Sequence, residues 1–360
     1  MTPNPSAAVH LSPSVYHRHV LDHTPQALAY RGGDVAAWQA NLRDKLLQLL
    51  GPLGTEPRGP LNVRSLWKRE HELGTIEKIV FNSEPYADVP AFLCLPRSAP
   101  PPYDWFICLQ GHSTGMHNSI RVQRDDNTAP HEVQGDRDFA LGCMARGIAA
   151  LAIEQRCLGE RCQTVQKQPN PRACTDSAMQ ALLLGRTLIG QRIYDVDRAI
   201  DYLATRNDVR MQTLGVMGNS GGGTTSLVAA AALPRVRLAM PSCYFCTFRD
   251  SIMAMHHCPC NYVPGLLCWA EMADIMGLFA PRPVVIVAGE MDDIFPIAGV
   301  RESFERLRAI YAAAGAAHRC HLVVGPEGHR FYADLAWPAM LGELARVKAK
   351  CKVRCDSTNG

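Results

Sequence analysis

The sequence predicts an α/β fold in which a mostly parallel central sheet is covered on both faces by helices. Two observations lead to this prediction. Short apolar runs, typical of buried strands, alternate with longer helical stretches, and such alternation is characteristic of parallel sheets whose crossovers are helices. A glycine-rich turn at 218–222 also joins one of these strands to the helix after it. A chain of 360 residues with 47% hydrophobic residues can bury one large core of this kind.

Residues 1–60 are expected to form an N-terminal extension with one amphipathic helix. Apolar residues recur at helical spacing between Asp34 and Leu50, and Asp34 suits the N-cap position. A Gly- and Pro-rich break at 51–60 follows. We expect this helix to pack on the main domain or on a partner.

Residues 61–350 are expected to form the main domain. The runs 76–81 and 89–95, with a turn around 84–86, predict a hairpin. The strands expected after it are 105–109, 148–153, 213–217, 236–240, 284–288 and 321–324. The helices expected with them are 138–146, 178–205, 221–233, 298–314 and 333–349. The basic segment 351–360 is expected to be a frayed C-terminal tail.

Charge and composition exclude several classes of partner. The formal charge is only +3 and no block of lysine and arginine interleaves with aromatic residues, so we expect no nucleic-acid partner. The N-terminus lacks a signal-peptide pattern, and no apolar run is long enough to span a bilayer, so we expect no membrane association. The sequence therefore predicts a cytoplasmic protein whose fourteen cysteines are reduced thiols. Its oligomeric state is not predicted.

Ser220 is the candidate nucleophile. It lies in the turn Gly218-Asn219-Ser220-Gly221-Gly222, between a strand-like run and a helix-like run. A serine on such a sharp turn has its hydroxyl exposed over the end of the sheet, and flanking glycines let neighbouring segments approach without a Cβ clash. The alternative is a turn serine that caps the following helix.

An activated serine needs a base, and the base needs a carboxylate that orients it. Asp292 follows the strand 284–288, and His329 follows the strand 321–324. We therefore predict Asp292 as the acid and His329 as the base. Asp293, in the same loop, is the alternative acid.

The tetrahedral intermediate of such a reaction needs two N–H donors. One is expected from Gly221, directly after the nucleophile. The second is expected from the loop 110–115 after the strand 105–109, where we choose the His112 amide and keep Ser113 as the alternative.

With these residues, the chain resembles the α/β-hydrolase superfamily, and within it the acetyl xylan esterase and cephalosporin deacetylase-like branch, with relatives among dienelactone hydrolase-like proteins. The resemblance covers residues 61–346 and rests on the segments 218–222, 289–292 with Pro296, 328–329 and 110–112. It implies an α/β-hydrolase fold and a Ser220, Asp292 and His329 triad. The segment 154–159 and Gly221 depart from the sugar deacetylases of that branch, so the resemblance does not imply a sugar substrate.

The function expected from these residues is a serine hydrolase that cleaves a carboxylic ester of a small polar or acylated substrate through an acyl-enzyme intermediate. The same triad also serves carbon-carbon bond hydrolases, amidases and peptidases, which remain alternatives. A hydrolase-like ligand receptor is the alternative from another class.

Two further sets of residues allow more than one interpretation. Glu154 and Arg156 follow the strand 148–153; they contact a polar substrate, or they form a loop network with Arg161 or Glu160. A second set has ligand types and spacing that suit zinc: Cys243, Cys246, His256, His257, Cys258 and Cys260. Here we favour reduced thiols packed under a loop, and we predict no metal and no cofactor, because a serine mechanism needs neither.

Overall fold

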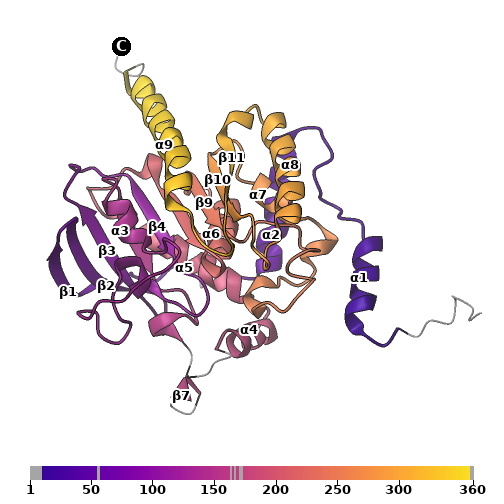
Figure 1. Cartoon of the computed structure of the whole chain (residues 1–360), viewed down its shortest axis with the longest axis horizontal. Coiled ribbons are helices and arrows are strands. Elements are labelled where there is room, and N and C mark those ends of the chain that lie inside the picture. The colour runs from indigo at the N-terminus through magenta and orange to yellow at the C-terminus, as the bar shows by residue number, and fades with distance from the viewer. Residues whose placement is uncertain (1–9, 55–56, 163, 166–167, 170–172, 357–360) are drawn as a thin grey trace, which may run out of the picture.

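The computed structural model describes residues 10–54, 57–162, 164–165, 168–169 and 173–356 (Figure 1). Within these residues, no helix combines the length and the apolar composition that a bilayer crossing requires. The described chain forms one large twisted sheet with helices packed on it, plus a small separate hairpin of β6 (Thr164–Val165) and β7 (Gln168–Pro169).

The large sheet has the strand order β1-β2-β3-β5-β4-β8-β9-β10-β11. Its strands are β1 (Arg64–His71), β2 (Gly74–Glu84), β3 (Ala87–Pro96), β4 (Trp105–Leu109), β5 (Ala149–Ile153), β8 (Gly215–Asn219), β9 (Leu238–Ser242), β10 (Val284–Gly289) and β11 (Cys320–Gly325). Neighbouring strands in the part β5-β4-β8-β9-β10-β11 pair in parallel. The strands β1, β2 and β3 form an antiparallel edge, and β3 pairs antiparallel with β5. The predicted mostly parallel sheet is confirmed.

The helices are α1 (Pro13–His23), α2 (Val35–Leu50), α3 (Phe139–Met144), α4 (Ala173–Leu183), α5 (Leu188–Ala204), α6 (Gly221–Ala232), α7 (Met272–Gly277), α8 (Ile297–Ala313) and α9 (Ala333–Asp356). Alternate residues of β4 belong to two different hydrophobic cores, one on each face of the sheet. Trp105 and Ile107 pack in the core that α2, α5, α6, α7 and α8 share, while Phe106 packs in the core under α3 and α9. The helices therefore cover both faces, as predicted.

The prediction of a single helix over 178–205 was wrong, because the structure has two helices there, α4 and α5. Gly185 adopts a positive φ of 66°, which ends the helical path after α4. Thr187 then caps α5, since its Oγ1 accepts a hydrogen bond from the Gly190 amide at 3.0 Å. A glycine and a threonine two residues apart are the signals that the longer helical pattern concealed.

Helix α2 has its predicted bounds and cap. The Asp34 carboxylate accepts hydrogen bonds from the amides of Ala36 and Ala37, and Leu42, Leu46 and Leu50 are buried against the main domain. The helix thus packs on the main domain, one of the two expected placements.

At the other end, the prediction of a frayed tail from residue 351 needs correction, because α9 continues as a helix to Asp356. Its alanine and lysine residues are good helix formers, which supports a helix beyond the buried Leu344. Residues 357–360 lie outside the described part.

Candidate active site

Ser220 lies at the carboxyl end of β8, where the chain turns sharply into α6. Its φ of 57° and ψ of −120° place a non-glycine residue in a strained conformation. Two glycines make the turn possible. A Cβ on Gly218 would lie 2.5 Å from the Leu109 carbonyl oxygen, and a Cβ on Gly222 would overlap the same oxygen. The Ser220 amide donates to the Ser242 carbonyl at 2.9 Å, which anchors the turn to β9.

His329 and Asp292 form a hydrogen-bonded pair beyond the ends of β11 and β10. The His329 Nδ1 and the Asp292 Oδ2 are 2.8 Å apart. The other carboxylate oxygen of Asp292 accepts from the amides of Ile294 and Phe295. Burial raises the pKa of Asp292, but the hydrogen bond and charge interaction with His329, together with the amides of Phe295 and Ile294, lower it by more, so the pKa is below its ordinary value and the carboxylate is ionised. Asp293 is exposed, and the carboxylate that contacts the imidazole is that of Asp292.

Cys243 is a neighbour of this pair that sequence reasoning did not connect with it. Its Sγ, an Asp292 oxygen and a His329 nitrogen all lie within 4.8 Å of one another. Burial raises the pKa of Cys243 to about 12, and its Sγ donates to the Arg330 carbonyl oxygen at 3.1 Å. The thiol is therefore neutral beside the Asp292 carboxylate.

The loop after β4 packs directly against the Ser220 turn. A Cβ on Gly111 would lie 2.9 Å from the Asn219 carbonyl oxygen, and one on Gly221 would lie 2.7 Å from Cε1 of the His112 ring. Within the described residues, neither the Gly221 nor the His112 amide donates a backbone hydrogen bond. The two amides predicted as oxyanion donors therefore lie on two segments that contact each other, the loop after β4 and the start of α6.

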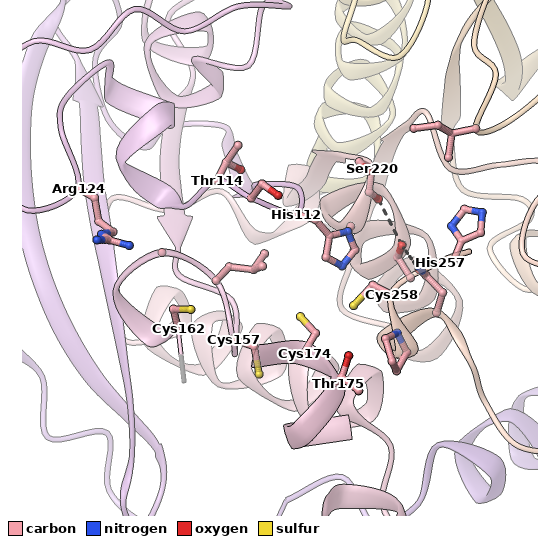
Figure 2. A pocket seen from close by; sticks show the side chains of 18 of the residues that line it. His112, Thr114, Arg124, Cys157, Cys162, Cys174, Thr175, Ser220, His257 and Cys258 are labelled. Carbon is pink, nitrogen blue, oxygen red and sulfur yellow. Dashed lines mark hydrogen bonds between the residues drawn. The ribbon is translucent and has the colours of Figure 1, made fainter. Parts of the chain in front are cut away.

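A pocket of about 980 Å³ opens over this turn. In Figure 2, Ser220 and Arg124 lie on opposite sides of it, with cysteine side chains between them. Phe295 also lines the pocket, and its ring stacks on the His329 ring with 5.8 Å between centroids. The pocket is lined by, among others, Ser220, Gly221, His112, Arg124, His257 and Cys258.

No family model matches the sequence. It is 26% identical over 294 residues to "Putative hydrolase YtaP" of Bacillus subtilis (strain 168), a match that covers 81% of this chain and 94% of that protein. Among solved structures it is similar to a "putative acetyl xylan esterase" from Bacteroides fragilis, with a TM-score of 0.73, 15% identity, and coverage of 94% of this chain and 86% of that one. It is also similar to a glucuronoyl esterase from Solibacter usitatus, with a TM-score of 0.62, 16% identity, and coverage of 90% and 97% respectively.

The chain has the α/β-hydrolase fold. In an α/β-hydrolase, a nucleophile, an acid and a histidine occur in this order along the chain, at the carboxyl edge of the sheet. Ser220, Asp292 and His329 follow that order here. Within the described residues, no hydrogen bond joins the Ser220 hydroxyl to the His329 ring. Such bonds are often long before substrate binds and tighten in the complex.

Glu154 and Arg156 do not line the pocket. Glu154 is buried and accepts hydrogen bonds from the amides of Met116 and Glu160. Arg156 makes a bidentate ion pair with the buried Asp195. These contacts favour the loop-network interpretation. Arg161, one of the partners suggested by the sequence, joins the network through the Glu154 carbonyl and Asp195, whereas the sequence did not suggest Asp195.

Only two of the six residues in the zinc-like sequence pattern come together in the structure. Cys258 and Cys260 come together with His112, from the loop after β4, and with Cys174, from α4. The other predicted candidates, Cys243, Cys246, His256 and His257, lie outside this group. Sequence spacing gave no signal for His112 or Cys174, because each comes from a different segment of the chain.

Proposed function

We propose that this protein is a serine hydrolase that cleaves a carboxylic ester through an acyl-enzyme intermediate. The observation that carries the proposal is the combination, at one edge of the sheet, of a strained serine on a strand-to-helix turn with a partly exposed histidine that is hydrogen-bonded to a buried aspartate. A serine that only shapes a turn would not need a histidine and aspartate pair at the ends of β10 and β11.

Ser220 Oγ attacks the ester carbonyl carbon, and His329 Nε2 accepts the serine proton. The ionised Asp292 accepts the hydrogen bond from His329 Nδ1, which fixes the tautomer that leaves Nε2 free as a base. His329 then returns the proton to the leaving alcohol. Water repeats the sequence on the acyl-enzyme and releases the acid.

The negative charge of each tetrahedral intermediate falls on the former carbonyl oxygen. The amides of Gly221 and His112 are the proposed donors to it, since both belong to segments that contact the Ser220 turn. Gln110 supports the second donor, because its side chain holds this loop through hydrogen bonds to Ser119 Oγ and the Arg137 carbonyl.

A small polar or acylated ester is the substrate class that suits the pocket. Its lining includes the charged side chains of Arg124 and Asp125 as well as His256 and His257. The similar structures are named as an acetyl xylan esterase and a glucuronoyl esterase, so their names describe ester hydrolysis. This supports an ester substrate over an amide or a carbon-carbon bond.

The test is hydrolysis of short-chain nitrophenyl esters together with labelling by a fluorophosphonate. We expect Ser220→Ala to reduce kcat/KM by at least about 10³-fold and to abolish the covalent adduct. Asp292→Asn should reduce kcat by about 10³ to 10⁴-fold, because the imidazole loses its orienting carboxylate. The matched control Asp293→Asn, which alters an exposed neighbour in the same loop, should retain activity.

Wild-type turnover by Ser220→Ala would refute the proposal. Labelling of Ser220 without turnover of esters, beside cleavage of a vinylogous diketone, would favour carbon-carbon bond hydrolysis. No adduct at Ser220 in the folded wild type would favour a ligand receptor.

A further inference from the structure

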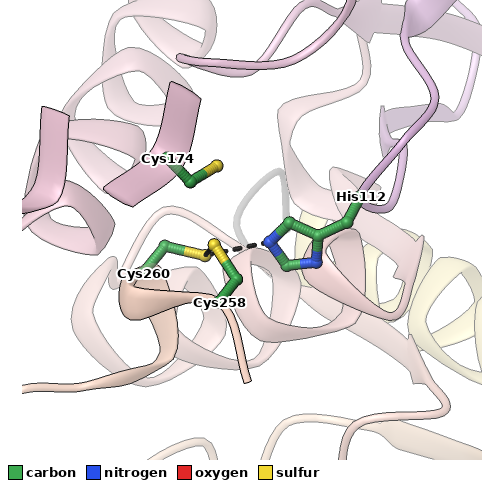
Figure 3. Close-up of side chains that lie close together, drawn as sticks. All are labelled: His112, Cys174, Cys258 and Cys260. Atoms are coloured by element: carbon green, nitrogen blue, oxygen red, sulfur yellow. Dashed lines mark hydrogen bonds between the residues drawn. The ribbon is translucent and has the colours of Figure 1, made fainter. Parts of the chain in front are cut away.

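Four metal-ligating side chains converge beside the Ser220 turn: His112, Cys174, Cys258 and Cys260 (Figure 3). They come from the loop after β4, from α4, and from a 3-10 turn at Pro259–Asn261, which Cys258 caps and whose central residue is Cys260. We propose that these four side chains bind one zinc ion, and that this structural zinc site fixes the position of the His112 loop against the nucleophile turn.

The distances suit a tetrahedral ion. The Nε2 of His112 is 3.0 Å from the Sγ of Cys260, and this Sγ is 3.2 Å from that of Cys258. All four ligand atoms lie within 4.8 Å of one another. With bonds of about 2.3 Å to sulfur and about 2.0 Å to nitrogen, tetrahedral ligand atoms are about 3.4 to 3.8 Å apart. Small side-chain movements therefore suffice to complete the coordination.

The chemistry of the four donors selects zinc. Three cysteines and one histidine are a common ligand set of structural zinc sites, and soft thiolates discriminate against magnesium and calcium. Four protein ligands leave no open position for water, so the site is structural and takes no part in activating a nucleophile. The serine mechanism proposed above is unchanged by it.

A buried cation balances the charge of such a site. Zn²⁺ with three thiolates and a neutral imidazole carries a single net negative charge. Arg192 is 1% exposed, and its Nη2 donates to the Sγ of Cys174 at 3.3 Å. Its Nη1 has no hydrogen-bond partner within the described residues. A buried guanidinium beside sulfur atoms is costly unless those atoms are anionic.

The location gives the ion a role. Three separate parts of the chain contribute ligands: the loop after β4, helix α4, and the excursion between β9 and α7. The His112 ring contacts Gly221, so coordination at its Nε2 holds the His112 amide in place beside Ser220.

The primary test is metal analysis of protein purified without added zinc. We expect about one zinc per chain, falling to about a tenth of that or less in Cys174→Ser and Cys258→Ser. Cys268→Ser, which removes an exposed cysteine outside the cluster, is the matched control and should retain the metal. Replacement by Co²⁺ should give the thiolate charge-transfer and tetrahedral ligand-field bands.

The wild type alone keeps the proposal testable if those variants fail to fold. Titration with an organomercurial should release zinc in proportion to the thiols modified, as followed with a chromogenic chelator. Folded wild-type protein that holds no zinc and takes up neither Zn²⁺ nor Co²⁺ would overturn the proposal. So would a disulfide between two of the three cysteines in protein purified anaerobically.

The positioning role rests on the proposed function and has its own readout. If zinc holds the oxyanion donor, folded zinc-depleted protein should lose about 10 to 100-fold in kcat with little change in KM, and readdition of zinc should restore it. Equal loss in both parameters, or none, would contradict that role. Ser220→Ala should be inactive yet retain its zinc, so failure of the metal proposal and failure of the hydrolase proposal are distinguishable.

Discussion

Ser220 illustrates how a single residue is held in an unfavourable conformation. A serine at positive φ costs about 1 to 3 kcal/mol and persists only where the surroundings fix it. Here the Ser242 carbonyl accepts its amide hydrogen, while Gly218 and Gly222 allow the Leu109 carbonyl to approach closely. The strain follows from a local motif, which is why the sequence alone indicated the sharp turn at Ser220, the proposed nucleophile.

The structure separates the two candidates for the proposed acid. Asp292 and Asp293 are adjacent and chemically identical, so no local pattern separates them. Tertiary packing buries the first, where it accepts hydrogen bonds from two amides and pairs with His329, and leaves the second exposed.

Glu154 allows a pH-dependent prediction. Burial raises the pKa of Glu154 from 4.5 to about 8, although the Glu160 and Met116 amides oppose this. Between about pH 4.5 and 8 the unfolded chain releases this proton while the folded chain retains it, so this group lowers stability as pH rises through that window. In Glu154→Gln this contribution disappears, while the loss of an amide hydrogen bond is independent of pH.

The expected result is that the unfolding temperature of Glu154→Gln, relative to wild type, increases from about pH 4.5 to 8 in thermal unfolding. Glu302→Gln, which alters an exposed carboxylate, should show no such trend. Parallel pH profiles for Glu154→Gln and the wild type would mean that the buried carboxyl ionises normally.

At the level of elements, the junction of β8 and α6 controls the site. The predicted strand and helix were correct to within two residues, because a buried strand followed by a helix of small residues gives a strong pattern. Strand β1 was missed. It is an edge strand with mostly exposed, charged residues, and such a strand lacks an apolar run.

A glycine pair tests this junction. Gly222→Ala should reduce the free energy of unfolding by about 1 to 3 kcal/mol, because the added Cβ would overlap the Leu109 carbonyl, a backbone atom that cannot rotate away. The control is Gly342→Ala in α9, where no atom lies within 4 Å of the added Cβ. It should stabilise the protein by about 0.5 to 1 kcal/mol.

Urea denaturation of both variants provides the measurement. An unchanged midpoint for Gly222→Ala would show that the turn relaxes to accept a side chain, and that its close packing is not required for stability.

Across the whole molecule, the N-terminal extension divides into a helix that stabilises the fold and one that does not. Helix α2 joins the larger core through Leu42, Leu46 and Leu50. Helix α1 has no buried residue and stands apart from the main body (Figure 1). Its contact with the rest includes an ion pair between Asp22 and Arg249, both partly exposed.

Truncation should separate the two. A chain that begins at Thr24 should retain its activity and unfold within about 2 °C of the full chain, since exposed ion pairs contribute only about 0 to 1 kcal/mol. Leu46→Ala in α2 should cost about 2 to 5 kcal/mol, because Leu46 is 1% exposed. A large loss of stability on truncation, measured by calorimetry, would show that α1 packs more firmly than its exposure indicates.

The sequence by itself determined the sheet type, the Ser220 turn and the chain order of the three proposed catalytic residues. Each depends on patterns within a few neighbouring positions, where strand periodicity and turn geometry are fixed locally. Only the tertiary structure placed Asp292 rather than Asp293 beside His329, placed Arg156 against Asp195, and brought Cys174 and His112 to Cys258 and Cys260. These contacts join residues far apart in the chain, and burial and close approach between distant segments exist only once the sheet has formed.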